Sequence, residues 1–169
     1  MRTQRLTKPL VAYRIGDSEG NYPVYSAQGA VENQGRWHYS GDAVIYASEH
    51  YATAMLEQLV HFHLEDVIPP EQFFVKITIP QGAKFEVAVA KKIKDWKAPD
   101  SQAARQFGHA WYEKNRSAVL IVPSVIAPVE RNILINTNHP DFSRIKHSRE
   151  ESVRWDTRLF AMRPRARSR

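Results

Sequence analysis

Two short, uninterrupted apolar runs constrain the fold of this chain more than any other feature. They are AVIYAS (residues 43–48) and SAVLIVPS (residues 117–124). A continuous apolar run of this length is typical of a strand that is buried on both faces of its sheet. Pro123 ends the second run. The sequence therefore predicts a sheet that contains at least two strands covered on both sides.

Further runs predict the other strands. FFVKITIP (73–80) alternates, with Val75, Ile77 and Ile79 on one face. The remaining candidates are LVAYRI (10–15), KFEVAV (84–89), NILIN (132–136) and an alternating final segment, RWDTRLFAM (154–162). Residues 16–35 and 91–101 are polar and rich in turn-forming residues, which predicts loops.

Two segments predict helices. Residues 49–66 follow Ser48, a candidate N-cap, and stop before Pro69 and Pro70. Their apolar i, i+3, i+4, i+7 stripe consists of Ala52, Met55, Leu56, Leu59 and either Val60 or His63. Residues 101–115 form the second predicted helix, with Ser101 as its N-cap. Because helices are few, we predict a single α+β domain with a mixed, mostly antiparallel sheet, not a doubly wound one.

The composition limits the class of protein. With 169 residues, 43% of them hydrophobic, the chain can form one domain with a real core. It has no cysteine, which excludes disulfides, thiolate metal ligands and cysteine catalysis. It has no run of about 18 apolar residues and no apolar segment typical of a secretion signal. We therefore expect a cytoplasmic protein that does not span a membrane.

The net charge of +6 comes from the ends of the chain. Residues 1–8 and 163–169 hold seven of the 24 Lys and Arg and no acid, which leaves 17 against 18 Asp and Glu elsewhere. A duplex-binding protein would carry its basic face in the folded body. We therefore expect no direct nucleic-acid contact, a domain over residues 1–162 and a basic, disordered tail over residues 163–169.

Several common motifs are absent from the sequence. It contains no G-x-G-x-x-G, no P-loop and no G-x-S-x-G nucleophile elbow. His61 and His63 are two residues apart, whereas a two-histidine metal face on a helix needs i, i+4 spacing. The sequence predicts no metal site.

Polar residues near the ends of the predicted elements indicate a ligand pocket instead. The candidates are Arg36, Tyr46, Glu57, Ser124, Asn132 and Asn136. A guanidinium before a strand suits bidentate phosphate binding, and a tyrosine inside an apolar strand needs a hydroxyl partner. Glu57 lies at the margin of the predicted apolar stripe, where a carboxylate is either solvated or held for chemistry. Each candidate also has a plain structural explanation, and the residues alone leave both open.

This ordered set resembles the RES-domain family, the toxin halves of bacterial toxin–antitoxin pairs, named for Arg, Glu and Ser positions in the site. The matching residues are Arg36 in GRW, Glu57 in TAMLEQLVH and Ser124 in LIVPS. Supporting matches are Tyr13 and Arg14, then Tyr46 and Ser48 in IYAS, and NILINTNHPDF from Asn132 to Phe142. The resemblance spans residues 12–142. One residue departs from it, because His38 stands where the family more usually has Asn.

The resemblance implies a fold related to the ADP-ribosyltransferase toxins, with NAD as substrate and no cofactor or metal. Family members cleave NAD by phosphorolysis, with inorganic phosphate as co-substrate, or by hydrolysis, and one branch ADP-ribosylates a protein. It implies Glu57, Arg36 and Tyr46 as catalytic residues, with Glu57 stabilising an oxocarbenium-like ribose. The implied substrate-binding residues are Arg14, Arg36, Tyr46, Ser124 and Asn136. The implied partner is a helix-turn-helix antitoxin, in a toxin–antitoxin hetero-oligomer that can include a toxin homodimer.

Three readings of the function stay open at this point. The first is NAD depletion, and the second is ADP-ribosylation of a specific protein. The third, of a different class, is a non-catalytic module that acts only through its antitoxin at DNA. The near-neutral body argues against direct DNA contact in the third case, and the intact Arg, Tyr, Glu and Ser set argues against an inactive relative.

Overall fold

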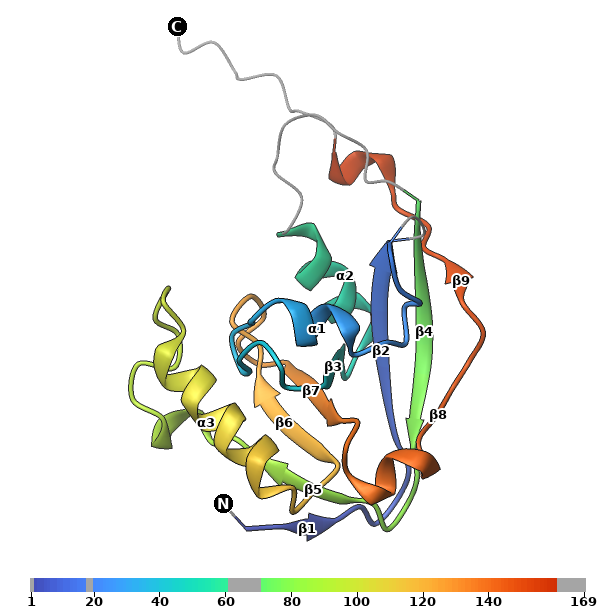
Figure 1. The fold of residues 1–169 in the computed structure, drawn as a ribbon. Helices are drawn as coiled ribbons and strands as arrows, with labels where there is room; N and C mark the ends of the chain where they lie inside the picture. The colour runs from blue at the N-terminus through green and yellow to red at the C-terminus, as the bar shows by residue number, and fades with distance from the viewer. Residues whose placement is uncertain (1, 18–19, 61–70, 161–169) are drawn as a thin grey trace, which may run out of the picture.

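The computed structural model describes residues 2–17, 20–60 and 71–160 (Figure 1). Within these ranges nine strands form one sheet in the order β1-β5-β6-β7-β3-β2-β4-β8, and β9 also pairs with β4. Their bounds are β1 Gln4–Arg5, β2 Leu10–Asp17, β3 Val44–Ser48, β4 Gln72–Ile79, β5 Lys84–Val87, β6 Val119–Pro123, β7 Arg131–Asn136, β8 Lys146–His147 and β9 Glu151–Ser152. Only β5 and β6 pair in parallel, so the predicted α+β class with a mostly antiparallel sheet is confirmed.

Side chains that alternate along the central strands build two hydrophobic cores, one on each face of the sheet. On β6, Val119 and Ile121 belong to one core, whereas Leu120 and Val122 belong to the other. The residues of β7 divide between the two cores in the same way. This explains why the strand sequences show uninterrupted apolar runs instead of an alternating pattern.

Three α-helices and three short 3₁₀ helices accompany the sheet in the described part of the chain. They are α1 Gln28–Glu32, α2 Tyr51–Leu59 and α3 Gln102–Lys114, with η1 Ala90–Lys92, η2 Pro140–Arg144 and η3 Thr157–Leu159. In Figure 1, α3 lies beside β5 and β6, whereas α1 and α2 lie near β2 and β3. None of the helices that the structure describes is long and apolar enough to cross a membrane.

Helix α2 packs on the sheet with a face that the sequence did not predict. Its buried residues are Thr53 and Ala54, whereas Leu56 and Val60 of the predicted apolar stripe are 44% and 58% exposed. The prediction was wrong because the side chains that α2 buries are one small and one polar, and these contribute little to an apolar stripe. Glu57 follows Thr53 and Ala54 by four and three residues, so it shares their inward face.

The predicted helix caps also differ from the structure. Ser48 is the last residue of β3, where it pairs with Tyr13 and Asn132, and His50 takes the N-cap position of α2. Ser101 does occupy the N-cap of α3, as predicted, but its side chain makes no cap bond and its Oγ contacts the Pro99 carbonyl oxygen.

Two further segments differ from the prediction, and two others lie outside the residues that the structure describes. The predicted loop at residues 16–35 contains the end of β2 and the helix α1. The alternating segment at 154–162 contains the 3₁₀ helix η3. Residues 61–66 of the predicted first helix and the tail at 163–169 lie outside the described residues.

Candidate active site

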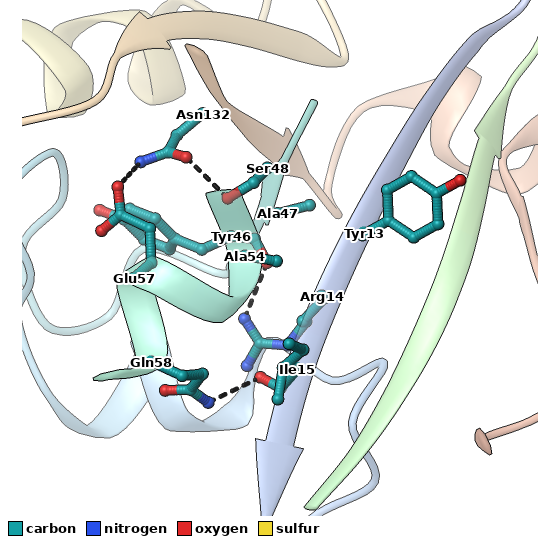
Figure 2. Close-up of a pocket in the computed structure, with 10 residues that line it drawn as sticks. All are labelled: Tyr13, Arg14, Ile15, Tyr46, Ala47, Ser48, Ala54, Glu57, Gln58 and Asn132. Carbon is teal, nitrogen blue, oxygen red and sulfur yellow. Dashed lines mark hydrogen bonds between the residues drawn. The ribbon is translucent and has the colours of Figure 1, made fainter. Parts of the chain in front are cut away.

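A cavity of about 270 Å³ opens between α2 and strands β2, β3 and β7 (Figure 2). Ten residues line it: Tyr13, Arg14, Ile15, Tyr46, Ala47, Ser48, Ala54, Glu57, Gln58 and Asn132. The strand register brings residues from distant parts of the sequence together here. Ser48 of β3 lies opposite both Tyr13 of β2 and Asn132 of β7. The cavity therefore forms where the central strands meet the inward face of α2.

Glu57 is held in the cavity wall by a chain of hydrogen bonds, drawn in part in Figure 2. Its Oε1 accepts from Ser124 Oγ at 2.8 Å and from Asn132 Nδ2 at 2.6 Å. Asn132 Oδ1 in turn accepts from Ser48 Oγ at 2.8 Å, which fixes the orientation of the amide. Among the described residues, nothing donates to Glu57 Oε2. One carboxylate oxygen is thus anchored while the other remains available to a ligand.

Arg14 places a cation in the same cavity without a carboxylate partner. Its Nε donates to the Val24 carbonyl oxygen at 2.6 Å and its Nη1 to the Tyr46 carbonyl oxygen at 3.0 Å. In the described part of the chain, Arg14 forms no ion pair. Burial lowers the pKa of Arg14, but a guanidinium stays protonated at neutral pH. A half-buried cation bonded only to carbonyl groups attracts anions.

Tyr46 presents its ring to the cavity, and its hydroxyl is already engaged. The hydroxyl accepts from the Trp37 backbone N–H at 3.1 Å and lies 2.8 Å from His38 Nδ1. His38 Nε2 faces the carbonyl oxygens of Ala30 and Asn33 at 3.1 and 2.9 Å, so this nitrogen carries the hydrogen. Nδ1 must then accept from the Tyr46 hydroxyl. Burial raises the pKa of Tyr46 well above its ordinary value, so Tyr46 acts as a neutral, fixed ring.

His38 is itself buried, and the tight turn around it explains the glycine of the GRW motif. Its side chain is 4% exposed, and desolvation lowers the pKa of His38 below its ordinary value of 6.5. A Cβ on Gly35 would lie 2.6 Å from the His38 ring, which is too close for any side chain. A neutral His38 therefore takes the position where the family more usually has Asn, and it orients Tyr46.

The structure brings together most, but not all, of the site residues predicted from the sequence. The cavity is lined by Arg14, Tyr46 and Glu57. Ser124 does not line the cavity, but its hydroxyl donates to the Glu57 carboxylate. Arg36 is absent from the cavity wall, and its Nη1 donates to the carbonyl oxygens of Trp96 and Ala98 at 3.2 and 3.1 Å.

Asn136 lies at the opposite end of β7 from the cavity. It is about 13 Å along the strand from Asn132. Its Nδ2 donates to Asn115 Oδ1, and its Oδ1 accepts from the Asn138 backbone N–H. These local hydrogen bonds satisfy the amide of Asn136, which is completely buried. The ligand contacts predicted for Asn136 and Arg36 stay predictions.

Two cavity residues have contacts that the sequence could not show. Asn132, the first residue of NILIN, was a candidate for the pocket, but its role as the donor that holds Glu57 depends on the β3–β7 register. Gln58 had no signal at all in the sequence. Its Nε2 donates to the Ile15 carbonyl oxygen at 3.0 Å and so ties α2 to β2 beside Arg14.

Comparisons with known proteins agree on one family. The model of the RES domain matches residues 11–156. A protein named "Prs ADP-ribosylating toxin" from Sphingobium sp. (strain YBL2) is 37% identical over 154 residues, covering 88% of this chain and 95% of its own length. A protein named "Toxin Res" from Photorhabdus laumondii is 31% identical, with 80% of this chain and 86% of that protein covered.

The fold also matches a solved structure. The crystal structure of the M. tuberculosis MbcT–MbcA toxin–antitoxin complex contains a chain that superposes with a TM-score of 0.68. The match covers 88% of this chain and 86% of that chain, at 14% sequence identity. At that identity the likeness establishes a shared fold.

Proposed function

This chain belongs to the RES-domain family, and from that premise we propose that it is the toxin of a toxin–antitoxin pair and that its cavity cleaves the nicotinamide–ribose bond of NAD. The observation that carries this proposal is the pairing of an anchored carboxylate with an uncompensated cation in one cavity. Among the described residues, nothing donates to the second oxygen of Glu57, and Arg14 donates only to carbonyl groups. NAD matches both groups, because its ribose gains positive charge as the nicotinamide leaves and its pyrophosphate is negatively charged.

The reaction requires little from the protein besides position and charge. When the nicotinamide–ribose bond breaks, nicotinamide leaves as a neutral molecule with the bonding electrons, so no general acid is needed. Positive charge then develops on the ribose, as in glycoside cleavage. The free oxygen of Glu57 stabilises this charge, because preorganised charges act most strongly in a site that excludes water.

The other cavity residues bind and orient the substrate. Arg14 binds the pyrophosphate, since charge-assisted bonds from a guanidinium suit phosphate oxygens. The fixed ring of Tyr46 packs against the nicotinamide or the ribose. The cavity of about 270 Å³ lies just below the roughly 300–1,000 Å³ usual for pockets that enclose a whole ligand. It holds the reacting half of NAD, and the adenosine extends outside, where Arg36 is a candidate contact.

The acceptor of the ADP-ribosyl group distinguishes two candidate functions. Phosphate or water as acceptor gives NAD phosphorolysis or hydrolysis. A protein nucleophile as acceptor, which loses a proton as the new bond forms, gives ADP-ribosylation. The relative from Sphingobium that is named an ADP-ribosylating toxin favours the second. Mass spectrometry of the products separates the three cases. Phosphorolysis gives ADP-ribose phosphate, hydrolysis gives free ADP-ribose, and ADP-ribosylation adds the ADP-ribosyl mass to a protein.

The partner that we propose is a helix-turn-helix antitoxin that covers the cavity. We propose that the two proteins meet in the cytoplasm. Leu56 of α2 and Val60, at the C-cap of that helix, are exposed apolar side chains close to Glu57 in the sequence. We propose that a partner that buries them also covers the cavity and blocks NAD. Co-expression with an antitoxin should therefore suppress NAD cleavage, and Leu56→Lys should weaken that suppression while leaving the free enzyme active.

The experiment that tests the proposed site replaces its carboxylate with the isosteric amide. Glu57→Gln should lower nicotinamide release by about 100-fold or more, the usual cost of removing one preorganised electrostatic group. The matched control is Glu151→Gln, since Glu151 is an exposed carboxylate on β9 outside the cavity. Equal activity of Glu57→Gln and the wild type would show that the cavity carboxylate plays no part.

A further inference from the structure

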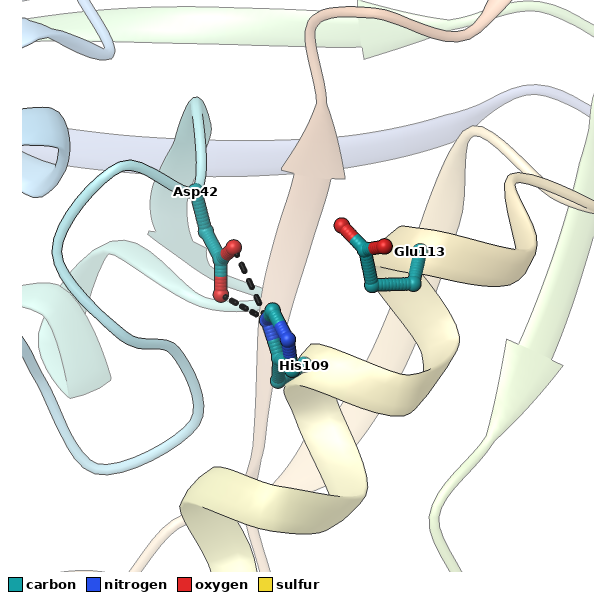
Figure 3. A group of neighbouring side chains, drawn as sticks. All are labelled: Asp42, His109 and Glu113. Atoms are coloured by element: carbon teal, nitrogen blue, oxygen red, sulfur yellow. Dashed lines mark hydrogen bonds and ion pairs between the residues drawn. The ribbon is translucent and has the colours of Figure 1, made fainter.

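Three side chains that commonly ligate metals meet on the side of α3, outside the cavity described above. They are Asp42, in the turn before β3, and His109 and Glu113 on α3 (Figure 3). One ligand atom from each residue lies within 4.8 Å of the others. His109 and Glu113 are four residues apart, so they project from the same face of the helix. Asp42 reaches them only through the tertiary fold.

The Asp42 carboxylate is buried and rigidly placed. It is 3% exposed, and its Oδ2 accepts from the Tyr39 backbone N–H at 2.9 Å. His109 Nδ1 lies 2.9 Å from both carboxylate oxygens, and because a carboxylate only accepts, this nitrogen donates to Asp42. The rings of Tyr39 and His109 form a T-shaped pair with their centroids 5.1 Å apart. Two of the three groups are therefore preorganised, as metal ligands usually are.

Glu113 adds a third possible ligand to the pair that His109 of α3 forms with Asp42. In Figure 3 its carboxylate faces the space beside His109 and Asp42. Within the described residues, neither Lys nor Arg forms an ion pair with Asp42 or Glu113. Arg105, one turn earlier on α3, donates to the Gly35 carbonyl oxygen instead. In the part of the chain that the structure describes, two carboxylates thus lie close to one imidazole without a Lys or Arg ion-pair partner.

The donor set selects the kind of cation. Ca²⁺ takes about six to eight oxygen ligands, and Mg²⁺ keeps an octahedral shell of oxygens, so neither suits a site with one nitrogen and two carboxylates. Zn²⁺ binds His nitrogen at about 2.0–2.1 Å and carboxylate oxygen at about 2.0–2.2 Å, often with three protein ligands and one water. We propose that Asp42, His109 and Glu113 form a divalent transition-metal site of the Zn²⁺ type.

The bound metal would stabilise the loop that supports Tyr46 in the cavity wall. It takes the place of the hydrogen that His109 Nδ1 shares with Asp42, and it ties α3 to the turn of residues 39–42. That turn follows Trp37 and His38, which hold the Tyr46 hydroxyl, and leads directly into β3. The metal touches none of the cavity-lining residues, so its role is to rigidify the support of Tyr46 without entering the chemistry.

The test uses the full chain, free of any affinity tag and stripped with a chelator, and needs no NAD activity. Calorimetric titration with Zn²⁺ should give one site per chain. Zn²⁺ at about 100 times its Kd should raise Tm by about 5–10 °C. Co²⁺ at the same site should show the visible absorption of a four-coordinate complex.

The variants separate this site from other histidines and from a merely structural ion pair. Glu113→Gln removes an exposed ligand, so metal-free Tm should be unchanged while Zn²⁺ affinity falls at least 10-fold. His109→Gln should lower affinity in the same way. The control is His147→Gln, because His147 is exposed on β8 and its Nδ1 contacts only the Ser148 carbonyl oxygen. No Zn²⁺ binding, or binding that survives in Glu113→Gln and His109→Gln, would overturn the proposal.

Discussion

Ser124→Ala tests whether the support of Glu57 matters as much as the carboxylate itself. Ser124 is completely buried, and its hydroxyl donates to Glu57 Oε1 at 2.8 Å while accepting from the Ala127 backbone N–H at 3.0 Å. The substitution deletes one of the two bonds that anchor Glu57 and leaves the one from Asn132 Nδ2. Glu57 remains in the cavity but loses its fixed orientation.

The size of the effect follows from the kind of bond that is lost. A hydrogen bond to a charged group is worth about 1.5–3 kcal/mol. If all of this free energy is lost from the stabilisation of the transition state, kcat falls by about 10- to 100-fold. The KM for NAD should change little, because Arg14 and Tyr46 are untouched. The lost bond to Ala127 also lowers Tm by roughly 2–8 °C.

A second buried serine, at the other end of β6, supplies the control for stability. Ser117, just before β6, is also completely buried; it accepts from Trp111 Nε1 at 2.8 Å and donates to the Val119 carbonyl oxygen at 3.2 Å. Ser117→Ala should lower Tm by a similar amount with kcat unchanged. Steady-state nicotinamide release and thermal melts measure both variants. If Ser124→Ala and Ser117→Ala lose the same activity, or if Ser124→Ala raises KM alone, the anchoring argument is refuted.

Three further perturbations follow from the same contacts. Arg14→Gln should weaken ADP-ribose binding by about 10- to 100-fold in calorimetry, since it removes a charge-assisted phosphate contact; unchanged affinity would place the phosphates elsewhere. The lowered pKa of His38 means that the unfolded chain binds more protons at pH values from 6.5 down to the folded pKa, so folding stability falls as pH drops through that window. His38→Gln should therefore flatten the fall in Tm between about pH 7.5 and about pH 5.5, and an unchanged slope would contradict the neutral His38. Gly108→Ala should destabilise the fold by more than about 3 kcal/mol, because the new Cβ would lie 1.8 Å from the Trp37 carbonyl oxygen; a melt equal to the wild type would refute this packing.

The strand pattern could be predicted from the sequence because burial on both faces leaves a direct local signature. The runs at 43–48 and 117–124 became β3 and β6, at the interior of the sheet. The two-residue strands β1, β8 and β9 had no such signature, since they exist only through pairing with longer neighbours. The docking face of α2 was mispredicted because its buried residues, Thr53 and Ala54, contribute little to the hydrophobic periodicity.

The resemblance, not the periodicity of α2, selected Glu57 and Arg14 as site residues, and the structure places both in the wall of one cavity. Both lie on regular elements, α2 and β2, which fix the direction of their side chains. Arg36 behaves differently, because its direction is set by carbonyl groups about 60 residues away, at Trp96 and Ala98. The Asp42–His109–Glu113 cluster was invisible for the same reason: histidine spacing alone cannot show a carboxylate that arrives from another part of the fold.

Release of free nicotinamide tests the central claim most directly, because it accompanies NAD cleavage whichever acceptor is used. Purified wild-type protein is incubated with NAD in plain buffer, with inorganic phosphate and with cell extract, and nicotinamide is quantified by chromatography. The account predicts release in at least one of these conditions and its loss in Glu57→Gln. The absence of nicotinamide from the wild-type reaction in all three would contradict the assignment of this cavity to NAD cleavage.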